Sequence, residues 1–353
     1  MQLQPTGARP APTPSSPGRA KPGRSSLPIG RRSPHGKIKR AEWLADVAVT
    51  ALREEALLTP KPALVDCRGS GAHSDLTLDL MLASASALRT PFVAMARASH
   101  QQRPSQLLRE QLAALGRAGE QAMLTTTGGV NTHRGAIWAL GLLVAATALS
   151  EPGTPAQTLA ECAGEIARYP DRYAPHEISH GLLVQQRHGI SGARAEAQQN
   201  FPHVIDDALP MLTFSRARGL TETHARLNTL IVLITRLSDT CILYRGGPIA
   251  LQAAQSGAYT ILEKGGTSTA QGWKALCELD RTLLAYHVSP GGSADLLAAT
   301  LYLAFLEQEF TGPRPSAGGM SPESSFFLAS PPQAANGEWM SDTEKGTGFL
   351  WRK

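Results

Sequence analysis

The feature that most constrains the fold of this chain is a helical spacing of apolar residues, which runs through almost every segment between residues 41 and 311. Residues 41–58, for example, place their leucine, valine and alanine side chains on one broad stripe at the period of an α-helix. Prolines and Gly-Gly pairs separate these segments, as is typical of helix ends, and only residues 63–65 form a short extended candidate. We therefore predict an all-α fold, a single domain of about ten helices. The helical patterns span residues 41–58, 75–90, 104–116, 132–149, 156–168, 177–188, 203–217, 221–243, 248–263, 268–287 and 293–309.

The two ends of the 353-residue chain differ in composition from this helical middle. Residues 1–40 contain nine basic residues, eight prolines and no acidic residue, which predicts a disordered basic tail. Residues 312–353 are rich in proline, serine and glycine and predict a flexible tail. The middle, residues 41–311, carries 21 basic and 25 acidic side chains, so the net charge of +5 belongs to the N-terminal tail. Because a nucleic-acid-binding core carries its own basic face, no nucleic-acid partner is expected.

The cysteine spacing and the hydropathy of the chain indicate the cellular compartment in which the protein is found. The four cysteines lie far apart without a Cys-x-x-Cys pair, which favours reduced thiols over a disulfide framework or a zinc site. No window approaches about 18 uninterrupted apolar residues, so no membrane span is expected. No apolar run follows the Arg31-Arg32 pair, so a secretory signal is not expected either. We therefore expect a cytoplasmic protein.

Gly-Gly pairs occur four times in the helical middle, each just before a predicted helix. Glycine allows a ligand to approach the backbone closely, and a helix N-terminus offers free N–H groups and a partial positive charge. The pairs therefore favour phosphate sites, although each could simply turn one helix into the next. Ser293 is the expected N-cap of the last of these helices. The candidate phosphate-binding residues at three of the pairs are Gly128, Gly129, Asn131, His133 and Arg134; Arg245, Gly246 and Gly247; and Gly291, Gly292 and Ser293.

The segment 61–75 gathers charged residues into a loop that is otherwise rich in glycine, alanine and serine. Small residues leave room for a ligand, and charged side chains have little other reason to gather there. Its candidate residues are Lys61, Asp66, Arg68, His73 and Asp75.

The helix that follows this loop has a predicted start. Ser74 is its expected N-cap, which places Asp75 in the first turn and on one face with Asp79. Two carboxylates at that spacing repel each other unless a cation such as Mg²⁺ lies between them or one of them faces solvent. The alternative for Asp75 is a favourable interaction with the helix dipole.

Two further aspartates lie in apolar surroundings. Arg236 and Asp239 are spaced to form a buried ion pair, and Asp295, near a helix start, is available for a metal ion or a hydroxyl group. From the residues alone, the chain is an all-α enzyme that binds a polyphosphate ligand, with Mg²⁺ expected, at the N-termini of several helices.

Four of these stretches resemble the triphosphoribosyl-dephospho-coenzyme A synthase family. They appear in the family's order, and the similarity spans residues 41–310 without the tails. The first is most similar to the malonate decarboxylase branch, although Cys67 stands where a charged residue is usual. The stretches are KPALVDCRGSGAHSDL (61–76), TTGGVNTHRGAIWALG (126–141), DTCILYRGG (239–247) and SPGGSADLLAATLYL (289–303).

The resemblance implies a reaction in which ATP transfers its triphosphoribosyl group to the ribose 2′-hydroxyl of 3′-dephospho-CoA and adenine leaves. The product would pass to a downstream transferase and the acyl carrier protein of malonate decarboxylase. An α-linked product made from a β-nucleotide implies direct displacement with inversion. A base takes the proton of the attacking hydroxyl, and a carboxylate stabilises the oxocarbenium-like centre.

The resemblance also implies residue roles, in which the four aspartates cannot be ranked. Asp66 or Asp75 would be the base or a Mg²⁺ ligand, with His73 orienting. Asp239 and Asp295 would be further metal or ribose ligands. The expected phosphate contacts are His133, Arg134 and Arg245, with Lys61 and Arg68 beside them.

Two other functions remain open at this stage. A helical metal-dependent phosphohydrolase would use His73, Asp75, His133 and Asp239 as metal ligands, although Ser74 separates the His and Asp that are adjacent in that type. Free phosphate in place of free adenine would identify it. A non-catalytic partner of the carrier protein would show no ATP turnover at all.

Overall fold

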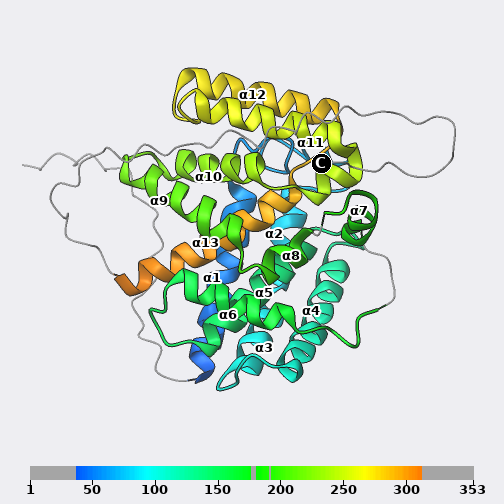
Figure 1. Cartoon of the computed structure of the whole chain (residues 1–353), viewed down its shortest axis with the longest axis vertical. Coiled ribbons are helices and arrows are strands. Elements are labelled where there is room, and N and C mark those ends of the chain that lie inside the picture. The colour runs from blue at the N-terminus through cyan, green and yellow to red at the C-terminus, as the bar shows by residue number, and fades with distance from the viewer. Residues whose placement is uncertain (1–36, 176–179, 191, 312–353) are drawn as a thin grey trace, which may run out of the picture. The chain divides into compact units, whose positions relative to one another are not determined.

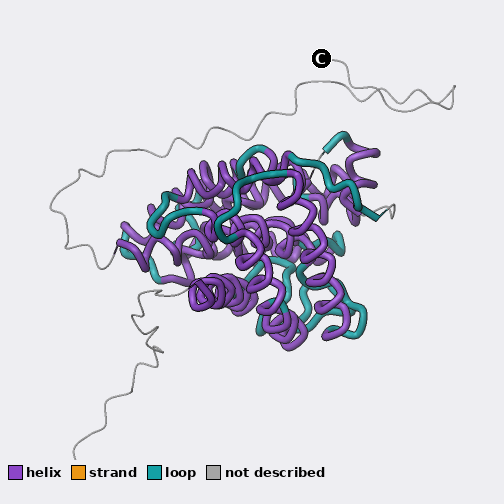
Figure 2. The backbone as a smooth tube through the Cα atoms, turned by 90° about the horizontal axis from the view of Figure 1, so that it is seen from below, coloured by secondary structure: helices purple, strands orange, loops and turns teal. Residues whose placement is uncertain are grey.

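The computed structural model describes residues 37–175, 180–190 and 192–311, and all of the regular structure in these ranges is helical (Figures 1 and 2). The all-α prediction is confirmed. Residues 63–65, the extended candidate, lie in a loop in which Ala63 has a positive φ of 54°. The helices are α1 (Lys37–Leu57), α2 (Leu78–Ala87), α3 (Arg89–Ser99), α4 (Gln106–Thr126), α5 (Arg134–Leu149), α6 (Ala156–Arg168), α7 (His180–His188), α8 (Gly192–Gln198), the π-helical turn η1 (His203–Ala208), α9 (Leu209–Ala217), α10 (Glu222–Arg236), α11 (Thr240–Glu263), α12 (Ala270–Ala285) and α13 (Gly291–Thr311).

Helix α5 forms the centre of the core. Eleven of its sixteen residues are Ala, Leu, Val or Ile, and twelve of the sixteen are buried. It packs against α1, α3, α6 and α13 (Figure 1). Gly141 lets α3 approach, since a Cβ there would lie 2.9 Å from the Met95 sulfur. A small residue in this central helix thus allows a neighbouring helix to pack closely against it.

Helix α11 links this core to α12, which runs alongside it in Figure 1. Gly247, with φ 68° and ψ −168°, interrupts α11, and Pro248 starts its second half. A break was expected at this Gly-Gly pair. No single described helix is long and apolar enough to cross a membrane; α10 and α11 meet that length and composition only as a pair bent by 62°.

The start of α2 differs from the prediction. Thr77, in extended backbone, is the N-cap, and its hydroxyl accepts a hydrogen bond from the Leu80 N–H at 3.3 Å. Ser74 is therefore not the N-cap, and Asp75 lies before the helix rather than on one face with Asp79. In the loop before α2, Gly71 has a φ of 58° and packs on the Ala63 carbonyl, where a Cβ would lie 2.3 Å away.

Two predictions near α11 and α13 were also wrong. Helix α13 starts at Gly291, so Ser293 lies inside its first turn and is not the N-cap. Arg236 does not pair with Asp239. It ends α10, and its Nε lies 3.6 Å from Asp207 Oδ1, whereas Asp239 is the N-cap of α11.

Two short helices were not predicted. Pro91, taken as a break, is the third residue of α3, where a missing N–H costs nothing. Helix α8 is only seven residues long, too short for its periodicity to stand out.

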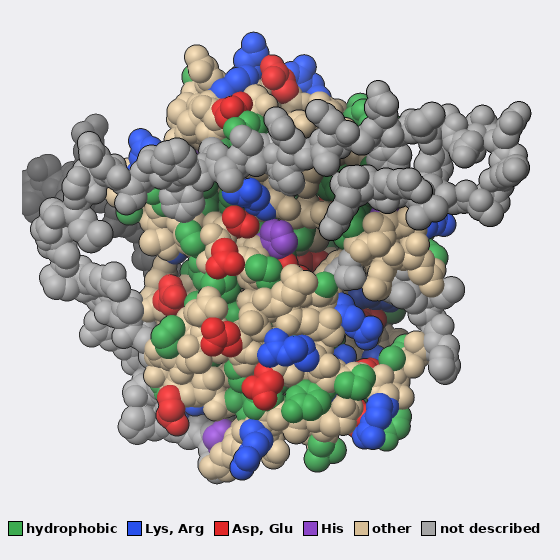
Figure 3. Space-filling view, viewed as in Figure 1, with side chains coloured by type: hydrophobic (Ala, Val, Ile, Leu, Met, Phe, Trp, Pro, Cys, Tyr) green, Lys and Arg blue, Asp and Glu red, His purple; other side chains and the backbone are tan. Residues whose placement is uncertain are grey.

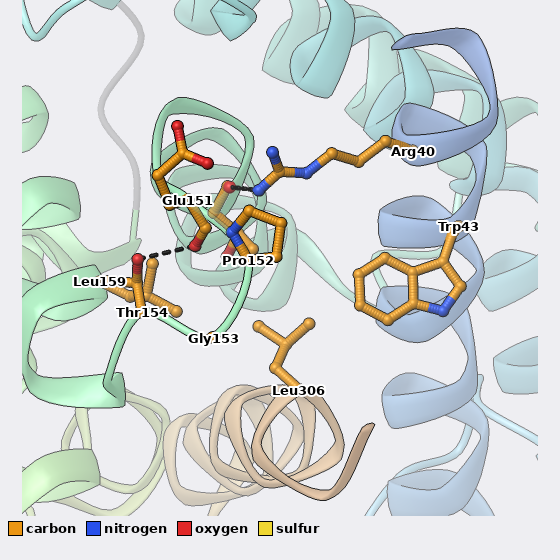
Figure 4. A pocket seen from close by; sticks show the side chains of 9 residues that line it. Arg40, Trp43, Glu151, Pro152, Gly153, Thr154, Leu159 and Leu306 are labelled. Atoms are coloured by element: carbon orange, nitrogen blue, oxygen red, sulfur yellow. Dashed lines mark hydrogen bonds between the residues drawn. The ribbon is translucent and has the colours of Figure 1, made fainter. Parts of the chain in front are cut away.

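The boundaries of the helical part lie close to the predicted ones. Helix α1 begins at Lys37, four residues inside the predicted N-terminal tail, and α13 ends at Thr311. Arg40 donates from Nη2 to the carbonyl of Thr147 at 2.9 Å at the C-terminus of α5, beside a small pocket (Figure 4). The predictions for residues 1–36 and 312–353 lie outside the described residues. On the face shown in Figure 3, basic and acidic side chains are interspersed.

Candidate active site

The loop between α1 and α2 is held by Asp66, which is 2% exposed. Its carboxylate accepts hydrogen bonds from the Lys61 N–H at 2.8 Å and the Arg68 N–H at 2.8 Å. The Arg68 guanidinium also donates to it, and pairs with Asp280 of α12 at 3.0 Å. Both oxygens of Asp66 are thus occupied by its own loop. This geometry makes Asp66 a structural anchor rather than a free base.

Lys61 is buried as well, with 1% exposure. Its Nζ donates to Glu55 Oε1 at 2.6 Å and to the Glu55 carbonyl at 2.7 Å, in the last turns of α1. A buried charge pair with this many contacts is costly to break. Lys61 therefore holds the acidic side chain of Glu55 in the interior. Because its ammonium group is already paired with Glu55, it is not free to bind a phosphate.

His73 connects three of the four family-like stretches. Its Nε2 lies 2.8 Å from Ser289 Oγ, its Nδ1 lies 3.3 Å from the Arg245 guanidinium, and Asp75 Oδ1 is 3.9 Å away. Burial and the charge of Arg245 lower its pKa to about 4. Because the guanidinium can only donate, Nδ1 of the neutral ring accepts and Nε2–H donates to Ser289. Asp75 and Arg245 are exposed beside it.

Asp239 joins α11 to α13. Its Oδ1 accepts from the Cys241 N–H at 2.9 Å, and its Oδ2 accepts from both the N–H and the hydroxyl of Ser293, at 2.8 and 3.0 Å. Burial raises its pKa, against these hydrogen bonds. Gly292 is needed for this approach, since a Cβ would lie 3.1 Å from Asp239 Oδ1. The predicted phosphate site at the start of α13 is therefore filled in part by a carboxylate of the chain itself.

Asp295 fills the start of α5 in the same way. A Cβ on Gly135 would lie 2.0 Å from Asp295 Oδ2, and the backbone of Ala136 hydrogen-bonds the carboxylate. Burial raises the pKa of Asp295 well above its usual value, and the negative charges of Glu55 and Asp239 add to the effect. Asp295 is still partly exposed to solvent. A carboxyl group in this state holds a proton more readily than an ordinary aspartate.

His133 ends the glycine turn before α5. It is 2% exposed, its Nδ1 lies 2.8 Å from Ser84 Oγ, and its Nε2 has no partner among the described residues. Burial and the charge of Lys61 lower its pKa to about 3, so the ring is neutral. Arg134, in contrast, is exposed and pairs with Glu120 at 3.1 Å. Of these two, Arg134 is the cation that a phosphate can reach.

The other residues of this turn are accessible. Gly128 and Gly129 are exposed, with φ of 67° and 96°, and no atom would obstruct a Cβ on either. Asn131 Oδ1 accepts from the Arg134 N–H at 3.2 Å. The pair Gly265-Gly266 does not join this region; Gly266 packs on Asn228, whose Oδ1 accepts from the Thr267 N–H at 2.8 Å.

The four stretches therefore converge on one group of side chains, which we call the carboxylate cluster: Glu55, Asp239 and Asp295, with Lys61 beside Glu55. His73 is linked to this cluster by its contact with Ser289, which lies three residues before Gly292. Asp75 and Arg245 lie beside His73. Sequence reasoning missed Glu55 and Ser289. Ser289 was visible at the edge of its stretch, whereas Glu55 lies in an Arg-Glu-Glu run that looks like a solvated helix face.

The expected Mg²⁺ has a limited set of ligands. Within the described residues, no three His, Cys, Asp or Glu side chains are grouped so that they could hold a metal ion. Mg²⁺ bound together with a nucleotide needs only one or two carboxylates, since phosphates and water complete its shell. Asp75, which is exposed, and Asp295, which is partly exposed, fit that second mode.

Comparison with known proteins identifies the class and then the family. The model of the ATP:dephospho-CoA triphosphoribosyl transferase family matches residues 41–313, so this helical protein is a transferase. The chain belongs to that family. No solved structure matches it.

Curated relatives agree with this assignment. A probable 2-(5″-triphosphoribosyl)-3′-dephosphocoenzyme-A synthase of Pseudomonas fluorescens is 56% identical over 268 residues, which are 76% of this chain and 92% of the relative. The synthase of that name from Klebsiella pneumoniae is 50% identical over 271 residues, 77% of this chain and 97% of the relative. A probable synthase of Stutzerimonas stutzeri is 51% identical over 287 residues, 81% and 97% respectively.

Proposed function

We propose that this chain transfers the 5-triphosphoribosyl group of ATP to the ribose 2′-hydroxyl of 3′-dephospho-CoA and releases adenine. The observation that carries the proposal is the convergence of the four family-like stretches on the carboxylate cluster, with exposed arginines beside it. The names of the curated relatives describe the same product.

The reaction needs two proton movements. The bond between adenine and C1′ of the ATP ribose breaks, and adenine leaves with the electron pair and takes up a proton. The 2′-hydroxyl of the acceptor forms the new bond to C1′ and loses its proton. Asp295, with its raised pKa, suits the role of acid toward adenine, and Asp75, an exposed carboxylate beside neutral His73, suits the role of base.

Phosphate groups require cations that a ligand can reach from solvent. Arg245 and Arg134 are exposed next to the cluster and are our candidates. The alternative to these proton-transfer roles is that Asp75 or Asp295, ionised, would hold Mg²⁺ that arrives with ATP, and the ion would neutralise part of the triphosphate charge. Asp239 and His73 position their neighbours: Asp239 holds the start of α13, and His73 holds Ser289 and Arg245.

The biological setting is also a proposal. The stretch 61–76 favours the malonate decarboxylase branch, so the product would pass to a downstream transferase and then to the acyl carrier protein of that enzyme. We propose a cytoplasmic location, since all four cysteines are free thiols. Offering the product to carrier proteins of malonate decarboxylase and citrate lyase, each with its transferase, would separate the two branches.

A direct assay tests the reaction. Purified protein with ATP, Mg²⁺ and dephospho-CoA should release one adenine for each triphosphoribosylated product, followed by chromatography and mass spectrometry, and EDTA should stop it. Release of ADP or inorganic phosphate would refute the proposal in favour of a phosphohydrolase. The absence of any turnover would instead favour a non-catalytic partner of the carrier protein.

The geometry does not favour the phosphohydrolase. Of its four expected metal ligands, only His73 and Asp75 are neighbours. Asp239 instead accepts hydrogen bonds from Ser293, and Nδ1 of His133 hydrogen-bonds Ser84.

A further inference from the structure

Arg109, on α4, is a buried cation that the proposed reaction does not yet use. It is 4% exposed, and its Nε has no hydrogen-bond partner among the described residues. Burying a charged group without full hydrogen bonding is expensive, and a native structure that keeps one requires an explanation. One such explanation is an anionic ligand.

The surroundings of Arg109 are positively charged and aromatic. Its guanidinium lies over the ring of Trp138 at 5.0 Å from the centroid, and Trp138 is fixed by a 3.0 Å hydrogen bond from Nε1 to the carbonyl of Ala193. Burial lowers the pKa of Arg109, and the charges of Arg194 and Arg117 act in the same direction. We call these four residues, Arg109, Arg117, Arg194 and Trp138, the Arg109 cluster.

Neighbouring carboxylates neutralise Arg117 of this cluster but form no ion pair with Arg109 itself. Asp171 and Glu110 both raise the pKa of Arg109, but each is held by another arginine. Asp171 pairs with Arg117 at 2.6 Å, and Glu110 pairs with Arg172 at 2.5 Å. Positive charge therefore remains at Arg109 and at Arg194, which is exposed.

The Arg109 cluster lies on helices that also reach the surroundings of the carboxylate cluster. Trp138 lies one turn along α5 from Gly135, which contacts Asp295. Gly192, the first residue of α8, packs on Thr240, where a Cβ would lie 2.7 Å from the threonine methyl carbon, and Thr240 follows Asp239. Helix α5 thus carries both Trp138 and the residue that contacts Asp295, and helix α8 carries both Arg194 and the residue that packs beside Asp239.

We propose that the Arg109 cluster binds phosphate groups of one of the two nucleotides. The inference rests on the proposed function, which brings a triphosphate and a diphosphate to one site. The starts of α5 and α13 already hold Asp295 and Asp239, so neither offers a full set of free N–H groups to a phosphate. Arg109 and Arg194 supply positive charge next to the place of reaction, and the indole gives a flat surface to which a base or a guanidinium can stack.

Calorimetric titration of ATP and of dephospho-CoA into the full chain tests this. Arg109→Met and Arg194→Gln should each lower the affinity for one nucleotide at least tenfold and keep the affinity for the other within about twofold of wild type. The nucleotide whose affinity falls is the one that supplies the phosphate. Adenosine, which has no phosphate, should bind the variants as it binds the wild type. Arg97→Gln on α3, an exposed arginine paired with Glu42 at 3.3 Å, is the matched control and should change neither affinity.

Thermal melting of the free protein separates ligand binding from structure. Arg109→Met should melt at the wild-type temperature or above, since a poorly paired buried charge is removed. A lower melting temperature with unchanged affinities would make Arg109 structural and overturn the proposal. So would unchanged affinities in Arg194→Gln, equal losses in Arg97→Gln, or a wild-type protein that binds neither nucleotide.

Binding is measured without turnover, so the two proposals fail separately. Nucleotide binding that depends on Arg109, without adenine release, would refute the reaction alone. Adenine release by variants with unchanged affinities would refute the phosphate site alone.

Discussion

Replacing Gly135 by alanine should remove activity while leaving the fold intact. The new Cβ would lie 2.0 Å from Asp295 Oδ2 and 3.0 Å from its Cγ, so the carboxylate must move by more than about 1 Å to reach ordinary contact. A displacement of about 1 Å at a reacting group costs on the order of 10²-fold in rate. We therefore expect kcat for adenine release to fall about 100-fold, which corresponds to about 2.7 kcal/mol.

Stability should change little, because two effects oppose each other. Alanine in place of glycine within a helix stabilises by up to about 1 kcal/mol, whereas the hydrogen bond between Asp295 and the backbone of Ala136 is strained. Gly116→Ala on α4 is the matched control, since its Cβ would meet only Met95 Cε at 3.9 Å. It should keep full activity.

A double-mutant cycle then tests whether the effect passes through Asp295. In an Asp295→Ala background, Gly135→Ala should cause no further loss of kcat, because the clash has no partner. A further hundredfold loss in that background would refute the reasoning, as would near-normal kcat in the single Gly135→Ala variant.

Three other predictions follow from the site. Asp75→Asn should lower kcat by roughly 10²–10⁴ with an unchanged melting temperature, because it removes the exposed carboxylate that we propose as the base; near-normal kcat would move that role to another aspartate. Arg245→Ala should raise KM for ATP or dephospho-CoA more than it lowers kcat, measured by steady-state kinetics, since a phosphate contact exists before and during the transition state. His73 and His133 have pKa values of about 4 and about 3, below the ordinary 6.5, so the unfolded chain binds more protons and stability is lost as pH falls from about 6.5 toward 4. In urea unfolding, the free energy of unfolding of His133→Gln should depend on pH less steeply than that of wild type, by up to about 1.4 kcal/mol per pH unit across that window. Parallel profiles would contradict a neutral His133 ring in the folded protein.

The helices were predictable from the sequence because each has a strongly periodic apolar face. The bounds of α6, for example, coincide with the predicted segment 156–168. Helix starts were less predictable, since several polar residues compete to cap each one. Thr77 caps α2 in place of Ser74, and Ser293 donates to a carboxylate from another helix instead of capping its own. Such choices depend on contacts that no local pattern contains.

The candidate site was predictable as a set of segments but not as a geometry. The anion-friendly helix starts were recognised as phosphate sites, and two of them hold Asp239 and Asp295. That could not be foreseen, because the partner carboxylates come from distant positions. Asp66 looked like a base because its hydrogen bonds from Lys61, Arg68 and Thr59 form only in the closed loop.

The hydrogen bonds of the site join positions that are far apart along the chain. His73 meets Ser289 across 216 positions, and Asp239 meets Ser293 across 54. A nascent chain that has not yet reached α13 has His73, Asp75 and Asp239 but lacks the residues that orient them. Catalytic competence is thus acquired only after α13 has been synthesised and has docked on α1 and α5. Adenine release is accordingly a reporter of completed tertiary structure, and on refolding it should return after the helical circular dichroism signal.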